Sequence, residues 1–135
     1  MEDSQEVYVI WNAVEEVVGR CGFLSLNDSK DGLCLTVFAN QASGLEIELK
    51  FDLKDVIGYK VSNDSYTWRS DSMRKRDGEW SMFKVEGSNY IQWFKDETYG
   101  ASDLSAVMHF SFLLGEVGVD IVSFNDPQVK VRARC

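Results

Sequence analysis

The segment Leu45-Glu46-Ile47-Glu48-Leu49-Lys50-Phe51 decides the predicted fold, because apolar and charged residues alternate at every position. Successive side chains of a β-strand point to opposite faces, so this alternation predicts a strand with one buried face and one exposed face. The apolar side chains are expected in the core, and Glu46, Glu48 and Lys50 are expected to face solvent or a partner. A strand with one solvated face is typical of an antiparallel sheet.

Short apolar runs bounded by turn-forming residues extend this sheet along the chain. Residues 27–32 and the glycines at 115 and 118 separate such runs and predict two hairpins. The further runs expected to form strands are residues 22–26, 33–39, 55–62, 80–86, 106–114 and 117–124. With the opening segment, they predict a mostly antiparallel sheet of about six to seven strands.

Two stretches have helical periodicity. In residues 5–19 the apolar side chains recur three and four positions apart, which predicts an N-terminal amphipathic helix. Several valines lower its helix propensity and leave an opening strand as the competing interpretation. Residues 88–98 predict a second helix with Ser88 as its N-cap. Strands and helices do not alternate as βαβ units, so we expect an α+β fold, with the helices on one sheet face, in a single domain over residues 1–135.

Charge and composition restrict the class of partner and the compartment. The chain holds 22 acidic and 14 basic residues, for a net charge of −8, with short basic islands at residues 67–76 and 127–135. An acidic surface repels phosphate backbones, so we expect no direct nucleic-acid binding. The polar, acidic N-terminus is unlike a secretory signal, and no apolar run approaches the length of a membrane span. We therefore expect a cytoplasmic protein that does not enter a membrane.

Residue types that carry chemistry are sparse. His109 is the only histidine, and it could pair in space with Cys34 as a nucleophile, although the residues give that pairing no support. Cys34 reads as a small core residue and Cys135 as a terminal thiol. The three cysteines lack the paired spacing of a zinc site, and no glycine-rich phosphate loop is present. We expect no enzyme, no metal and no cofactor, with a small hydrolase or isomerase as the weakest alternative.

Two segments stand out as candidate contacts with a partner. The alternating strand presents acids on its exposed face, although a merely solvated face explains them as well. Residues 63–78 form a polar stretch in which a tryptophan stands beside an arginine, a composition typical of binding anchors or of a pinned loop. The candidate partner-binding residues are Glu46, Glu48, Asp52, Asp64, Trp68 and Arg69.

Four short strings carry a resemblance to a known class of proteins. They are Asp55-Val56-Ile57-Gly58-Tyr59-Lys60-Val61, Ser88-Asn89-Tyr90-Ile91-Gln92-Trp93-Phe94, His109-Phe110 and Asp120-Ile121-Val122-Ser123. The stretch that contains them, residues 51–126, resembles bacterial toxin-immunity proteins, including those of contact-dependent growth inhibition systems.

The resemblance implies a cytoplasmic antidote that binds and neutralises a cognate toxin domain, commonly a nuclease, without turnover. A toxin that handles nucleic acid tends to be basic, and the acidic charge of this chain would speed association with such a surface. The alternative is an adaptor or structural domain that binds a peptide or subunit through an exposed strand edge.

Overall fold

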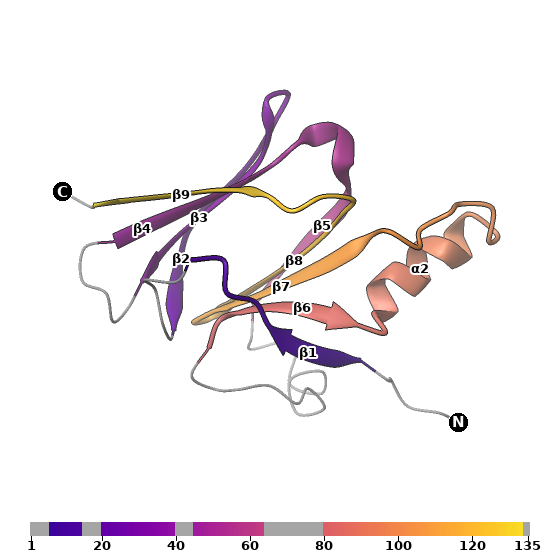
Figure 1. The fold of residues 1–135 in the computed structure, drawn as a ribbon, viewed down its shortest axis with the longest axis horizontal. Coiled ribbons are helices and arrows are strands. Elements are labelled where there is room, and N and C mark those ends of the chain that lie inside the picture. The colour runs from indigo at the N-terminus through magenta and orange to yellow at the C-terminus, as the bar shows by residue number, and fades with distance from the viewer. Residues whose placement is uncertain (1–5, 15–19, 40–44, 64–79, 134–135) are drawn as a thin grey trace.

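Two antiparallel β-sheets face each other in the computed structural model, which describes residues 6–14, 20–39, 45–63 and 80–133 (Figure 1). The elements are β1 (Val7–Ile10), β2 (Cys21–Ser29), β3 (Gly32–Ala39), β4 (Leu45–Phe51), the 3-10 turn η1 (Leu53–Asp55), β5 (Val56–Asn63), β6 (Met82–Glu86), α2 (Asn89–Glu97), β7 (Met108–Leu114), β8 (Val117–Ser123) and β9 (Gln128–Ala133).

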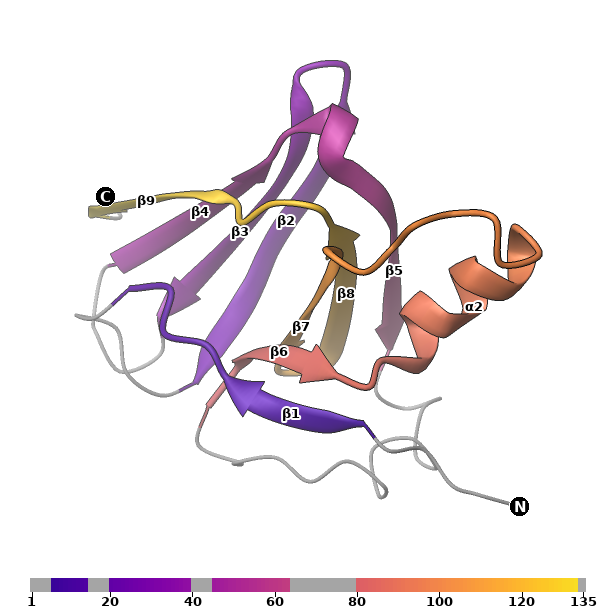
Figure 2. The ribbon, with the colours of Figure 1, turned by 45° about the vertical axis from the view of Figure 1, so that its right-hand side comes forward.

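The five-stranded sheet has the order β1-β6-β7-β8-β5, and the four-stranded sheet has the order β2-β3-β4-β9. Every paired neighbour is antiparallel. The chain passes from one sheet to the other between β1 and β2, at η1, and between β8 and β9. The last two crossings lie at a corner that the sheets share, and the sheets spread apart from it (Figure 2). The predicted hairpins β2–β3 and β7–β8 are confirmed.

The core fills the space between the two sheets. The predicted alternation of β4 is confirmed, because Ile47, Leu49 and Phe51 are fully buried on its inner face. Phe51 meets Phe110 of β7 with ring centroids 5.3 Å apart, which joins the two sheets edge to face. Full burial of each such side chain contributes roughly 1.5–3 kcal/mol to stability.

The α+β expectation with two helices was wrong, since the described chain is mostly β and contains one α-helix, α2. The helix predicted over residues 5–19 is absent from residues 6–14, where Val7–Ile10 form β1 and pair with β6. The competing interpretation, an opening strand, was correct there. Valine and isoleucine favour the pleated backbone, and the edge of the β6 strand supplies the hydrogen bonds that sequence periodicity could not reveal. Residues 15–19 lie outside the described ranges.

The strand count also exceeded the expectation, with nine strands in the described residues. The largest omission is β9, since no strand was predicted after residue 124. It pairs with β4 through the register Glu46↔Arg132 and Glu48↔Lys130. The basic island near the C-terminus is therefore a strand that lies directly against the acidic strand.

The predicted helix near residues 88–98 is confirmed as α2, with Ser88 as its N-cap. The helix packs on the outer face of the five-stranded sheet through Ile91 and Phe94, against Val122. Gly58 of β5 permits this approach, since a Cβ there would lie 2.7 Å from Cζ of Phe94. This packing places the first turn of α2 beside His109 of β7.

Candidate functional site on the outer face of the five-stranded sheet

A hydrogen-bonded chain of Ser88, His109 and Asp120 lies beneath the first turn of α2. His109 Nε2 is 2.7 Å from Asp120 Oδ1, and His109 Nδ1 is 2.6 Å from Ser88 Oγ. The ionised carboxylate only accepts, so Nε2 carries the proton, and in the neutral ring Nδ1 accepts from the serine hydroxyl. Ser88 Oγ in turn accepts from the Ile91 N–H at 3.1 Å. Each group therefore has a matched donor or acceptor.

The surroundings of this chain are crowded and partly charged. His109 is 3% exposed, and the Tyr90 ring meets it edge to face at 5.8 Å. Burial, with Asp120 nearby, raises the pKa of the Tyr90 hydroxyl. Lys60 Nζ stands 4.7 Å from the centre of the same ring. Ser111, opposite Asp120 in the β7–β8 register, has a buried hydroxyl without a partner in the described structure.

Serine, histidine and aspartate in a chain can activate a hydroxyl for acyl transfer. Such chemistry also needs donors aimed at the developing oxyanion. The first amide of the helix, Asn89 N–H, already donates to the carboxylate of Glu6 at 2.8 Å. The hydrogen bonds tie α2 to β7 and β8, and an acid from the N-terminal segment lies at the positive end of the helix dipole.

The cysteine–histidine pair considered from the sequence is not assembled. Cys34 lies on the outer face of the four-stranded sheet, with its Sγ 3.1 Å from Glu48 Oε2, while His109 lies on the outer face of the other sheet. The core separates them. Burial, and next the contact with Glu48, raise the pKa of the Cys34 thiol, so this thiol is less ionised than an ordinary one.

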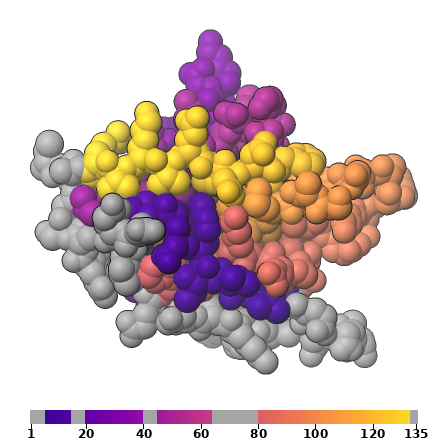
Figure 3. Space-filling model, in the orientation of Figure 1, coloured from indigo at the N-terminus to yellow at the C-terminus, as the bar shows by residue number. Residues whose placement is uncertain are grey.

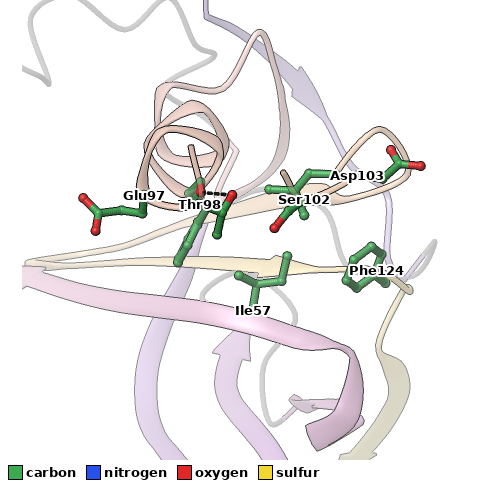
Figure 4. A pocket seen from close by; sticks show the side chains of 8 residues that line it. Ile57, Glu97, Thr98, Ser102, Asp103 and Phe124 are labelled. Carbon is green, nitrogen blue, oxygen red and sulfur yellow. Dashed lines mark hydrogen bonds between the residues drawn. The ribbon is translucent and has the colours of Figure 1, made fainter. Parts of the chain in front are cut away.

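A cavity of about 430 Å³ opens at the other end of α2 (Figure 4). Its apolar walls come from the helix, from β5 and from the chain on either side of the β7–β8 hairpin, and its polar rim comes from the last turn of α2 and the segment that follows. The lining residues are Ile57, Phe94, Glu97, Thr98, Ser102, Asp103, Leu104 and Phe124. The Glu97 and Asp103 carboxylates point outward on opposite sides of the opening.

Exposed aromatic rings stand around this cavity. Trp93, on α2, is 52% exposed. The centroid of its ring lies 5.0 Å from that of Phe94, which lines the cavity wall. Phe124 of the wall is itself 38% exposed. Asp103 accepts hydrogen bonds from the Ser105 side chain and backbone, which lower the pKa of its carboxyl. The opening therefore joins apolar surface to fixed negative charge.

The predicted acids Glu46 and Glu48 lie together on the outer face of the four-stranded sheet, as expected for β4. Arg132 of β9 reaches both, with Nε 3.2 Å from Glu46 and Nη1 3.6 Å from Glu48. The two acids thus face an internal cation. Asp52 is exposed before η1 and lies 3.4 Å from Lys54 Nζ. The remaining candidates, Asp64, Trp68 and Arg69, and the terminal Cys135, lie outside the described residues.

Sequence reasoning missed that Ser88, Asp120 and His109 meet. A signal was present, because closing the predicted hairpin at Gly115–Glu116 sets Ser111 opposite Asp120 and therefore places His109 diagonally from that carboxylate. The contribution of Ser88 had no such signal, since it depends on where α2 packs. The cavity likewise requires segments that are distant in sequence.

Comparisons with family models, with curated proteins and with solved structures find no match for this chain. Within the described ranges, no group of His, Cys, Asp and Glu is arranged to hold a metal ion. The same part of the chain contains no helix with the length and apolar character needed to cross a membrane. The geometry of the outer face is therefore the basis of the functional assignment.

Proposed function

We propose that this protein is a cytoplasmic immunity protein, which binds a cognate bacterial toxin domain stoichiometrically and neutralises it. The observation that carries the proposal is the apolar cavity at the end of α2, with carboxylates at its rim and aromatic side chains beside it. Pockets that accept an apolar side chain, next to exposed aromatic residues, are the usual centres of protein interfaces. Such a surface is suited to a macromolecule that supplies both an apolar anchor and positive charge.

Charge supports a basic partner. The net charge of the chain is −8, and residues 95–103 alone hold three acids and one base. A basic toxin would be attracted to this end of the molecule and would associate faster than a neutral protein. The acids of β4 are less suited to the task, because Arg132 already lies beside Glu46 and Glu48.

The test uses the purified chain and the toxin domain encoded by the gene adjacent to its own. Calorimetry should show a one-to-one complex, and the chain should abolish toxin activity at equal molarity. In the double variant E97Q/D103N we expect association to slow by about tenfold at low salt, and the difference should shrink as salt is added. The matched double variant E46Q/E48Q, on the other sheet, should associate at close to the wild-type rate.

The results also separate the proposal from its alternatives. Absence of a complex, together with undiminished toxin activity, overturns the immunity function. Binding to a partner through an exposed strand edge would instead be nearly independent of salt and of both double variants, which would favour the adaptor function.

A second candidate function, a small hydrolase, is favoured by one observation, the Ser88–His109–Asp120 chain. An activated serine would attack a fluorophosphonate probe, its Oγ displacing fluoride while His109 takes the hydroxyl proton. Mass spectrometry should then locate the adduct on Ser88, and H109A should prevent labelling. An unlabelled wild-type protein removes the hydrolase candidate and leaves the chain as a structural strut.

A further inference from the structure

The C-terminal end of α2 has an unusual backbone. The helix closes with a Schellman turn, in which Gly100 N–H donates to the Lys95 carbonyl at 2.8 Å and Tyr99 N–H donates to the Asp96 carbonyl at 3.0 Å. The residue at the left-handed position of this turn is Tyr99, with φ 53°, where glycine is the common choice. Among the described residues it is the only non-glycine with positive φ.

The side chain of Tyr99 does not offset this unfavourable backbone. Its ring is 97% exposed, so it contributes almost no buried apolar surface to the fold. A bulky residue in the left-handed region is less stable there than glycine, because its Cβ crowds the neighbouring carbonyl. Folding alone would therefore favour glycine at position 99.

Two of the three charged residues in the same turn are also placed against stability, Lys95 being the favourably placed cation. Asp96 and Glu97 stand in the last turn of α2, at the negative end of the helix dipole, where cations are preferred. Asp103 adds a third carboxylate across the cavity from Glu97. Strained backbone, an exposed ring and repelled acids thus coincide at one place, which is typical of a functional site and not of a fold optimised for stability.

This turn also lies where a partner can reach it. α2 runs outward from the sheet, and the chain that follows it forms a projecting corner of the molecule (Figures 1 and 3, orange). Figure 4 shows Thr98, one residue before Tyr99, at the opening of the cavity. The turn that carries Tyr99 is therefore next to the apolar cavity and to the carboxylates at its rim.

We propose that Tyr99 is the anchor residue of a protein-docking surface at the end of α2, and that this surface receives a basic segment of the partner. The segment places one apolar side chain in the cavity, and its lysines or arginines lie over the Tyr99 ring and beside Glu97 and Asp103. The negative charge of the site favours a cationic segment, since three carboxylates would repel an acidic one. The inference rests on the proposed immunity function and names its contact surface.

The decisive variant is Tyr99→Gly. If Tyr99 is strained, this variant should stabilise the fold, and if Tyr99 is the anchor, the same variant should weaken binding. Removal of the unfavourable backbone should raise Tm by about 3 °C or more. Loss of the anchor should weaken toxin binding at least tenfold in calorimetry. Y99F keeps the ring and should bind within about threefold of wild type. G100A retains Tyr99 but forces alanine to φ +74°, so it should lower Tm without a comparable loss of affinity.

The outcomes separate the two levels of the proposal. If the wild-type chain does not bind or neutralise the toxin, the immunity function fails, and the docking surface fails with it. If the wild type binds and Y99G binds equally well, the anchor is refuted while the immunity function stands. A fall in the Tm of Y99G would refute the strain at Tyr99 and with it the reasoning that selected this turn.

Discussion

Replacement of Ser88 by alanine tests whether the buried chain holds α2 on the sheet. The Ser88 hydroxyl accepts from the Ile91 N–H and donates to His109 Nδ1, so S88A removes a helix cap and leaves a buried nitrogen without its donor. Loss of an N-cap costs about 1 kcal/mol. An unsatisfied buried acceptor costs about 1–3 kcal/mol more, so we expect a total destabilisation of roughly 2–4 kcal/mol.

This free energy is large enough to measure simply. At about 2.1 cal/mol/K of unfolding entropy per residue, the 135-residue chain should lose about 7–14 °C in Tm. Urea unfolding followed by circular dichroism should show a lower midpoint with an unchanged slope.

Two further variants divide the effect of S88A. Ser88→Gly retains most of the capping preference but removes the hydroxyl, so its destabilisation should come mainly from the lost hydrogen bond with His109. Ser88→Thr keeps the hydroxyl and should lie close to wild type. A loss below about 0.5 kcal/mol in S88A would show that the chain does not stabilise the α2 contact, because that is the scale of an ordinary surface substitution.

Three other outcomes follow from close contacts and from thiol titration. Gly58→Ala should cost about 1–3 kcal/mol in urea unfolding, because its Cβ would displace the Phe94 ring and lift α2; an unchanged midpoint would contradict the close approach. Burial raises the pKa of Cys21 to about 11 from 9.0, so the folded state keeps a proton that the unfolded chain loses, and stability should fall by roughly 2 kcal/mol between pH 9 and 11. That fall should be weaker in C21A, measured by urea unfolding across the same range. Replacing Glu48 by glutamine should speed alkylation of Cys34 at pH 8 severalfold in peptide mapping, because one cause of its raised pKa is removed; an equal rate would show that burial alone governs this thiol.

Some of the fold could be predicted because it depends on neighbours in the chain. The alternation of β4 selects its buried face directly, and tight turns define the β2–β3 and β7–β8 hairpins. The α2 helix and its Ser88 cap are equally local, since the cap bonds to an amide three residues away. In these segments the same residues that form the element also specify it.

The charged face of β4 shows where such reasoning ends. Periodicity correctly placed Glu46 and Glu48 outside the core, but it left open whether they are merely solvated or contact a partner. Their neighbour is Arg132, 86 residues after Glu46, and it arrives only because β9 pairs with β4. The apolar spacing at the N-terminus fitted either a helix or a strand, and pairing of Val7–Ile10 with β6 decided it.

By itself, then, the sequence determined the β-strands with one solvent-exposed face, the two hairpins, the capped helix and the net negative charge of the chain. Tertiary structure alone decided the division into two sheets, the junction of Ser88, His109 and Asp120, and the cavity beside the strained Tyr99 turn. The physical reason is distance along the chain. Periodicity and capping depend on residues a few positions apart, so the sequence can show them. Sheet pairing and the packing of α2 on Gly58 join segments that are distant in the chain, and no local pattern predicts such contacts.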